Sequence, residues 1–385
     1  MTNQSKLFFL RAAVSVALLF SLNWASELSQ KGEFEQRYLW VVRNALTSKS
    51  SINQMINFAT LNRFNHILVQ VRGRGDAYYN SMIVPKSQLI NDANFDPLAY
   101  LIPRAKEKGI HVHAWVNTYL LWSSRSKPAQ DDHLFYSHPE WIDQNKQIQL
   151  NLSEEMQNFN SGKNGNEGFY LSPNHPKVNS YLLTVFRDLI ENYELDGLHL
   201  DYVRFHDSEY GQNPAAIAYF RKYNGMKAYP PEETFGVSEW NDHRRKAITD
   251  LVRETKNLIE TVRPGVELSA AVKPNLYQAR ERYFQEWDVW LAAGYLDKAV
   301  VMNYTKNLKE FADNIDIMYD NLPSKYRKKI VMGIATYNQP ADQVVDKVKY
   351  TRVTRFKGIS FFSYNVMAQN PQYFRLIKKI LYPRG

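Results

Sequence analysis

Eight short apolar runs recur along the chain, and each is followed by a segment with helical periodicity. The runs are rich in β-branched residues, as expected for strands. Strands that alternate with helices favour a parallel sheet, because each parallel connection must cross over the sheet. Eight such units in about 340 residues predict a (β/α)8 TIM barrel. The expected strands are 38–42, 66–71, 110–116, 197–201, 266–271, 299–304, 330–334 and 358–362.

Two connections are much longer than the others, at about residues 117–176 after the third strand and 205–242 after the fourth. Both follow the carboxyl end of a strand, and that face of a barrel carries the active site. The chain contains no low-complexity linker and no internal repeat. We therefore expect residues 26–385 to form a single barrel domain with long loop insertions after strands 3 and 4.

The first 25 residues have the pattern of a signal peptide. Lys6 and Arg11 supply positive charge, and the apolar stretch at 12–22 is too short to cross a bilayer comfortably. The small residues Ala25 and Ser26 follow it. This pattern predicts a cleaved signal, a periplasmic or secreted protein and no stable membrane insertion after cleavage, and an uncleaved anchor is the alternative.

Composition excludes several classes of site. The chain has no Cys, which rules out disulfides, thiolate metal sites and a Cys nucleophile. Its formal charge is +9, and loss of Lys6 and Arg11 with the signal leaves +7. A basic exported protein can attract an anionic polymer. Because no Lys/Arg stripe or nucleic-acid-binding motif is present, we expect no nucleic-acid partner.

The fourth expected strand, "DGLHLDYVRFH", contains polar residues where a buried strand would be apolar. Side chains alternate between the two faces of a strand. The leucines at 198 and 200, with Tyr202, would pack under the helices, so His199, Asp201 and Val203 would point into the barrel. A carboxyl group at that end of a barrel strand indicates catalysis. The alternatives are an ion pair of Asp201 with Arg204 or Arg72, and a packing role for His199.

Polar and aromatic side chains also follow the other strands, and such groups hydrogen-bond to sugars and stack on them. The chain has 25 Tyr, 20 Phe and 8 Trp, which fits a carbohydrate cleft or simply a large aromatic core. His111 and His113 lack a third metal ligand at useful spacing, so we expect no metal and no cofactor.

The stretches "ILVQVRGRGDAYYNS", "FDPLAYLIPRAKEKGIHVHAWVN", "SHPEWI", "LSPNHPKV" and "MNYT", together with "DGLHLDYVRF", resemble the bacterial glycosyl-hydrolase-like family ten. This resemblance implies a (β/α)8 barrel and glycosidase activity on an envelope polysaccharide, and some relatives act on peptidoglycan strands without peptides. The chain departs from the family pattern at "AAVKPN" and "EWNDHRR". The resemblance points to Arg72, Asp76, His113, Trp115, Asn117, His199, Asp201, Arg204 and Tyr304.

A fainter similarity links strands four and six to family 18 chitinases, but Val203 stands where those enzymes have a catalytic Glu. Most glycosidases need two carboxyl groups. Asp201 is the only one placed at a strand end, so its partner would come from a loop. Asp76, Glu239 and Asp242 are the candidates, unless an N-acetyl group of the substrate acts as nucleophile with help from Tyr304.

We therefore predict a glycoside hydrolase that cleaves peptide-free peptidoglycan strands or another N-acetylhexosamine polymer. Asp201 would be the general acid and Tyr304 a second catalytic residue. The alternative is a non-catalytic glycan-binding protein on a degenerate barrel. The expected substrate-binding residues are Arg72, Asp76, His113, Trp115, Asn117, His199, Arg204, Lys273, Asn303, Tyr337 and Tyr364.

Overall fold

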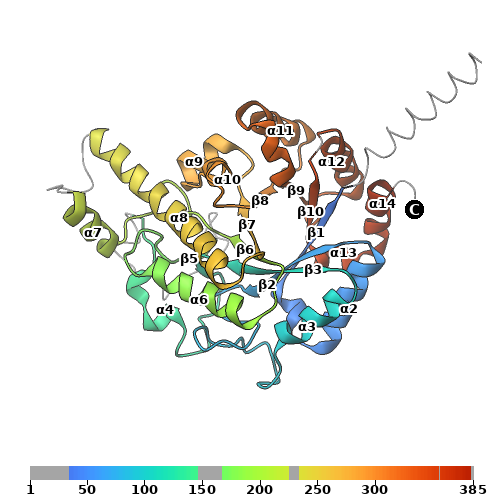
Figure 1. Cartoon of the computed structure of the whole chain (residues 1–385), viewed down its shortest axis with the longest axis horizontal. Helices are drawn as coiled ribbons and strands as arrows, with labels where there is room; N and C mark the ends of the chain where they lie inside the picture. Colours follow the sequence, from blue (N-terminus) through green and yellow to red (C-terminus); the bar gives the residue numbers. More distant parts are fainter. Residues whose placement is uncertain (1–33, 146–166, 225–233, 355, 383–385) are drawn as a thin grey trace, which may run out of the picture.

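The computed structural model describes residues 34–145, 167–224, 234–354 and 356–382. Eight parallel strands close into a barrel in the order β1-β10-β9-β8-β7-β6-β3-β2, with helices around the outside (Figure 1). The predicted (β/α)8 barrel is thus confirmed, and every predicted strand end lies within two residues of an observed one. The strands are β1 (Gln36–Val41), β2 (His66–Arg72), β3 (His111–Asn117), β6 (Gly197–Asp201), β7 (Glu267–Val272), β8 (Lys298–Met302), β9 (Ile330–Ala335) and β10 (Gly358–Phe362).

The helices begin and end where local chemistry favours it. In α3, Pro97 is the first residue, and Asp96 caps the helix by accepting hydrogen bonds from the backbone N–H groups of Leu98 and Ala99, both at 3.0 Å. The principal helices are α2 (Lys49–Leu61), α3 (Pro97–Lys106), α6 (Val178–Asn192), α8 (Thr234–Val262), α11 (Leu308–Asn321), α12 (Ala341–Val353) and α14 (Pro371–Leu381).

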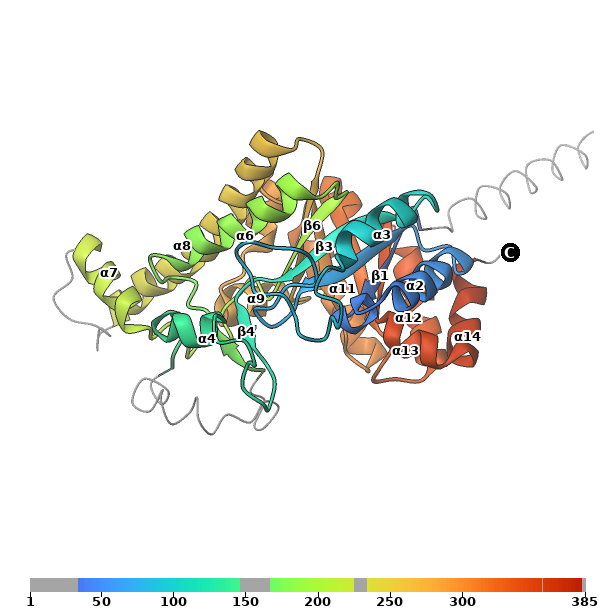
Figure 2. The ribbon, with the colours of Figure 1, turned by 90° about the horizontal axis from the view of Figure 1, so that it is seen from below.

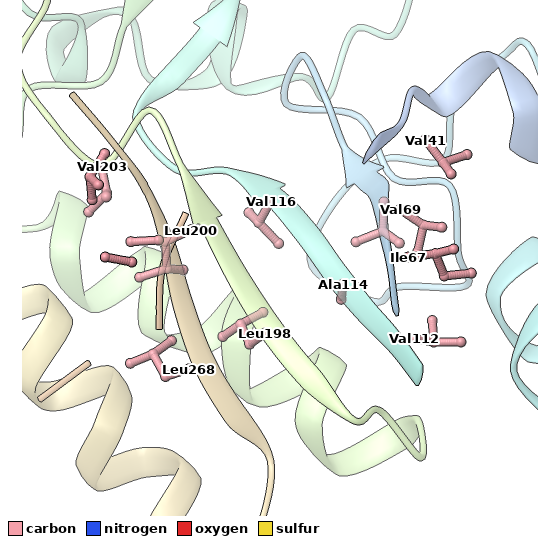
Figure 3. Close-up of a cluster of buried hydrophobic side chains, with 14 of the residues drawn as sticks. Val41, Ile67, Val69, Val112, Ala114, Val116, Leu198, Leu200, Val203 and Leu268 are labelled. Carbon is pink, nitrogen blue, oxygen red and sulfur yellow. The ribbon is translucent and has the colours of Figure 1, made fainter. Parts of the chain in front are cut away.

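The main hydrophobic core lies between the strands and the surrounding helices. Ala114 on β3 is in register with Leu198 on β6, which is in register with Leu268 on β7, and all three are buried in this layer (Figure 3). Full burial of an aliphatic side chain such as leucine contributes about 1.5–3 kcal/mol. Every second residue of a strand packs outward in this layer, so the residues between them face the barrel interior.

A second, smaller core fills the inside of the barrel. It contains Tyr38, Trp40, Leu68, Trp115 and Val300, with further small and aliphatic residues. The ring of Trp40 meets that of Trp115 edge-on, with centroids 4.8 Å apart. These bulky side chains fill the inside of the barrel, so it is a packed core and not a channel.

The described parts of both predicted insertions follow the carboxyl ends of β3 and β6. The first contains β4 (Leu120–Trp122), α4 (Leu134–Ser137) and β5 (Phe169–Tyr170), and β4 pairs with β5 in an antiparallel sheet. The second is more helical than expected, since α7 (Pro214–Asn224) is followed by α8, which already begins at Thr234. Figure 2 shows α4, α7 and β4 at the end of the molecule away from α12 and α14.

The predicted signal peptide at 1–25 lies outside the described residues, as does part of the first insertion. Among the helices that the structure does describe, none combines the length and the hydropathy that a membrane crossing requires.

Candidate active site at the barrel mouth

A cavity of about 470 Å³ opens at the carboxyl ends of the strands. Volumes of this size are typical of small-ligand sites. Seven residues singled out in the sequence line it: Trp115, Asn117, Asp201, Arg204, Lys273, Tyr304 and Tyr337. The lining also contains Gln70, which the sequence placed at the same mouth. The sequence did not indicate the other lining residues as site residues, and these are Trp40, Val42, Arg43, Arg74, Leu120, Ser123, Glu167, Tyr202, Met302 and Phe362.

Asp201 is the last residue of β6, and its side chain is inside the barrel mouth as predicted. It is only 6% exposed, and its Oδ1 accepts a hydrogen bond of 2.8 Å from the backbone N–H of Tyr202. Burial raises the pKa of Asp201 to about 6, because it outweighs the opposing effects of the Tyr202 N–H and of Arg204. The carboxyl group therefore keeps its proton to a much higher pH than an exposed aspartate.

Glu167 supplies the second carboxyl group of the cavity. Its Oε2 is 2.7 Å from Nη2 of Arg204, and it also accepts a hydrogen bond from the Tyr170 hydroxyl. Burial raises the pKa of Glu167, but Arg204 and the two hydrogen bonds more than offset this and hold it at about 2. The mouth thus combines a carboxyl group that keeps its proton up to about pH 6 with one that is ionised above about pH 2. Such a separation of pKa values is typical of acid–base pairs.

None of the three loop acids proposed from the sequence lines this cavity. Glu239 is exposed on α8, and Asp242 on the same helix forms an ion pair with Arg245 at 2.5 Å. Asp76 is buried and accepts a hydrogen bond from the backbone N–H of Arg74 at 3.1 Å. The sequence pattern does not indicate Glu167, because this residue lies beside β5 in an insertion without strand or helix periodicity.

Arg204 does not form the ion pair with Asp201 that was one alternative to a catalytic role for Asp201. Its guanidinium is buried and pairs with Glu167, and it also donates a 3.0 Å hydrogen bond to the backbone carbonyl of Phe205. Lys273 stands on the same side of the cavity, with its Nζ 4.4 Å from the centre of the Tyr283 ring. Burial and the neighbouring Arg204 lower the pKa of Lys273 to about 8.

Tyr304 places an unused hydroxyl group on the cavity wall. This hydroxyl is buried and has no hydrogen-bond partner among the residues that the structure describes. Burial raises its pKa, and the nearby Asp201 adds to the effect. A buried donor without a protein partner is costly, so it favours a ligand that accepts its hydrogen bond. Tyr337, in contrast, is 56% exposed at the rim, where a ring can stack on a sugar.

An amide network fixes the other wall. Asn117 Oδ1 accepts hydrogen bonds from Trp115 Nε1 at 2.9 Å and from Gln70 Nε2 at 3.2 Å. Asn117 Nδ2 donates to the carbonyl of Gly73 at 2.7 Å. These bonds orient two predicted site residues, Trp115 and Asn117, and add Gln70.

Several predicted site residues lie away from the cavity lining. Arg72 is two residues after Gln70 and would share its face in a regular strand, but the register of β2 with β3 shifts between these two residues. Arg72 is buried and donates hydrogen bonds to the backbone carbonyls of Asn117 and Thr118, so it ties together the end of β3. The expectation for Val203 was also wrong, since Tyr202 has a φ of +52° and lines the cavity while Val203 joins the outer core (Figure 3).

Two predicted histidines fill the barrel below the cavity. His113 is in register with Gly197, at the start of β6, and its Nε2 is 2.9 Å from Nδ1 of His66. His199 Nδ1 forms a hydrogen bond of 2.8 Å with Ser269 Oγ, and the His199 ring meets that of Trp40 edge-on. Burial lowers the pKa of both His113 and His199 to about 3, which keeps them neutral. His199 therefore has a packing role, which was the alternative to substrate binding.

Asn303 and Tyr364 are turned toward the helices instead of the cavity. Asn303 donates a 3.0 Å hydrogen bond to the carbonyl of Phe311 and accepts one from Asn314, both on α11. The ring of Tyr364 packs on Phe58 of α2. Within the described residues, no group of three His, Asp or Glu side chains is placed to hold a metal ion.

Comparison with known proteins agrees with this architecture. A glycosyl hydrolase DigH of Escherichia coli is 24% identical over 341 residues, which cover 82% of this chain and 67% of that protein. A glycosyl hydrolase YngK of Bacillus subtilis is 23% identical over 264 residues, which cover 66% of this chain. The chain spans less than half of YngK, 43% of its length.

Two solved structures share the fold at low sequence identity. The glycoside hydrolase domain of PgaB from Bordetella bronchiseptica matches with a TM-score of 0.66 at 13% identity, over 90% of this chain and 98% of that one. The catalytic domain of a β-amylase from Paenibacillus polymyxa matches with a TM-score of 0.58 at 11% identity, over 92% of this chain and 99% of that one. The family model described as glycosyl hydrolase-like 10 matches residues 35–349, so the resemblance seen in the sequence is confirmed and the chain belongs to this family.

Proposed function

We propose that the chain is a periplasmic or secreted glycoside hydrolase that cleaves peptide-free peptidoglycan strands or a similar N-acetylhexosamine polymer. The observation that carries this proposal is the pair of carboxyl groups in one cavity, with the pKa of Asp201 at about 6 and that of Glu167 at about 2. Glycosidases need one carboxyl group that holds a proton and one that is ionised.

Asp201 is the general acid in this reaction. Its proton passes to the glycosidic oxygen as the bond from that oxygen to the anomeric carbon breaks, so the leaving sugar departs as an alcohol. The positive charge that develops on the sugar ring is stabilised by the ionised Glu167. Water then adds to the anomeric carbon and restores the proton to Asp201.

The group that attacks the anomeric carbon defines two routes. In the first, Glu167 acts directly or activates a water molecule, although its ion pair with Arg204 lowers its basicity. In the second, the carbonyl oxygen of the substrate's own N-acetyl group attacks, and the free Tyr304 hydroxyl orients that group. The second route requires an N-acetylated sugar, whereas the first does not.

A non-catalytic glycan-binding protein remains the competing function, because Arg204 holds Glu167 in a structural ion pair. The decisive experiment incubates the protein with peptide-free peptidoglycan strands and with chitooligosaccharides and identifies products by mass. Asp201→Asn, Glu167→Gln and Tyr304→Phe are compared with Glu239→Gln, which makes the same carboxyl-to-amide change on the exposed face of α8. Binding without cleavage of either glycan would support the competing function.

A further inference from the structure

Two arginines, Arg43 and Arg74, stand together on one wall of the cavity. Arg43 begins the short 3-10 helix that follows β1, and Arg74 lies in the loop after β2. Both line the cavity and are half-buried. Unlike Arg204, neither has a carboxylate within ion-pair distance among the residues that the structure describes.

Neutral groups hold each guanidinium in place. Arg43 Nη1 donates a 2.8 Å hydrogen bond to Oε1 of Gln70, which belongs to the amide network of Asn117. The side chain of Arg43 lies directly over Gly73, where an added Cβ would come 2.7 Å from Arg43 Cδ. Arg74 Nε donates to Ser123 Oγ at 3.1 Å. These contacts fix both side chains, and neither guanidinium forms an ion pair with any residue that the structure describes.

The arrangement brings like charges together at a cost. Burial lowers the pKa of Arg74, and the neighbouring Arg43 lowers it further. The nearby Asp76 opposes this shift, but it accepts a hydrogen bond from the backbone N–H of Arg74 and forms no ion pair with either guanidinium. Each arginine has further N–H donors that no described residue accepts. Guanidinium groups with free donors in a cavity wall bind carboxylates well, because their planar geometry matches that of the anion.

The other cations of the cavity lie on another part of the wall. The strand order places β1 four strands away from β7, which Lys273 directly follows. Lys273 and Arg204 lie close to Glu167, and Lys273 also lies close to Asp201. Asp201 and Glu167 therefore lie near Lys273 and Arg204. The acid near Arg74 is Asp76, which is buried and does not line the cavity.

We propose that Arg43 and Arg74 form a subsite for a carboxylate carried by a sugar of the glycan, a role that rests on the proposed glycosidase function. The lactyl ether of an N-acetylmuramic acid whose peptide has been removed carries such a group. The subsite would select strands with this free carboxylate, since amide-linked peptide or a neutral sugar offers no anion there. A uronic acid is the other common sugar with the same chemistry.

The test measures binding to protein carrying Asp201→Asn, so that cleavage does not interfere. The probes are a peptide-free tetrasaccharide with muramic acid, its counterpart with the carboxyl groups reduced to alcohols, and a glucuronic acid tetrasaccharide. We expect the first to bind about tenfold or more tightly than the reduced form, because charge-assisted hydrogen bonds are stronger than neutral ones. The preference should weaken with salt. Equal affinity for the acid and its reduced form would overturn the proposal, and tighter binding of the glucuronate would identify a uronate subsite.

Variants at the subsite separate a specific contact from general charge attraction. Arg43→Gln and Arg74→Gln should each remove most of the preference for the acid. Gly73→Ala should do the same with all charges kept, since the new methyl group displaces Arg43. Arg187→Gln on α6 removes one positive charge from an exposed position outside the cavity and should leave the preference unchanged. An equal loss in Arg187→Gln would refute a local subsite.

The outcomes for the subsite and for catalysis are separable. Acid-selective binding without any cleavage by the unmodified protein would refute the glycosidase function and leave the subsite standing. Equal cleavage of the acid and reduced tetrasaccharides, with equal affinities, would refute the subsite and leave the glycosidase standing. Thermal unfolding of each variant identifies any that loses binding only because it has lost its fold.

Discussion

Replacement of Asp201 by Asn should make the protein more stable at neutral pH while it abolishes most of the activity. Burial raises the pKa of Asp201 in the folded state from an ordinary 3.8 to about 6. The folded protein therefore binds this proton more tightly than the unfolded chain, and stability falls as the pH rises from about 4 to 6. Asparagine carries no charge, and its Oδ1 can still accept the hydrogen bond from Tyr202.

The size of the effect follows from the shift. A difference of about two pKa units corresponds to about 3 kcal/mol, which the charged Asp201 costs the fold at pH values above about 7. The gain from Asp201→Asn should therefore be about 0.5 kcal/mol near pH 4 and about 3 kcal/mol near pH 8. Turnover should fall by about 10²-fold or more, the usual effect of removing a general acid.

Urea unfolding of both proteins between pH 4 and pH 8 measures the first effect, and cleavage of peptide-free peptidoglycan strands measures the second. A gain that is absent at pH 8, or the same at every pH, would refute the idea that burial disfavours the charged form of Asp201. A well-folded Asp201→Asn protein with full turnover would refute its role as general acid. Glu239→Gln serves as the control for both measurements, because that carboxyl group is exposed.

Glu167→Gln removes the charge that compensates the buried Arg204, so we expect it to lower the free energy of unfolding by about 1–3 kcal/mol. This loss is smaller than for a fully buried pair, because 38% of the Glu167 side chain is exposed. Urea unfolding beside Glu239→Gln checks this, and an unchanged midpoint would contradict it. Tyr304→Phe should change stability by less than about 1 kcal/mol, since its hydroxyl has no partner among the described residues, yet it should slow cleavage of N-acetylated oligomers more than of de-N-acetylated ones. Equal slowing of both oligomers would argue against substrate assistance. Because the pKa of His199 is lowered from 6.5 to about 3, the folded protein binds fewer protons than the unfolded chain in that interval, and stability should fall as the pH drops below about 6.5. His199→Gln should flatten this decline in unfolding experiments between pH 7.5 and 4.5, and an unaltered slope would show that other groups dominate.

The strands and the inward position of Asp201 could be predicted from the sequence because both depend on local periodicity. Alternation within a strand assigns each side chain to one face, and outward leucines such as Leu198 and Leu200 then require Asp201 to face the barrel interior. The same reasoning failed at the ends of strands. A register shift turned Arg72 away from the face of Gln70, and the left-handed backbone of Tyr202 reversed the positions of Tyr202 and Val203.

Depth along the barrel axis also could not be predicted. His113 and Asn117 share a face of β3, but His113 packs on His66 near the start of the strands and Asn117 lines the mouth. Only the stagger between neighbouring strands determines which inward residues reach the cavity and which fill the barrel below it.

The tertiary structure alone decided which loop residues complete the site. Glu167 belongs to the insertion after β3, and the pairing of β4 with β5 helps to carry it to the mouth beside Arg204. Arg43 and Arg74 come from the loops after β1 and β2 and meet only because these strands are neighbours in the closed barrel. Loop residues have no periodic pattern, so their positions depend on contacts between distant parts of the chain. The sequence by itself therefore determined the barrel and its inward acid, whereas closure of the barrel and packing of the insertions determined the rest of the site.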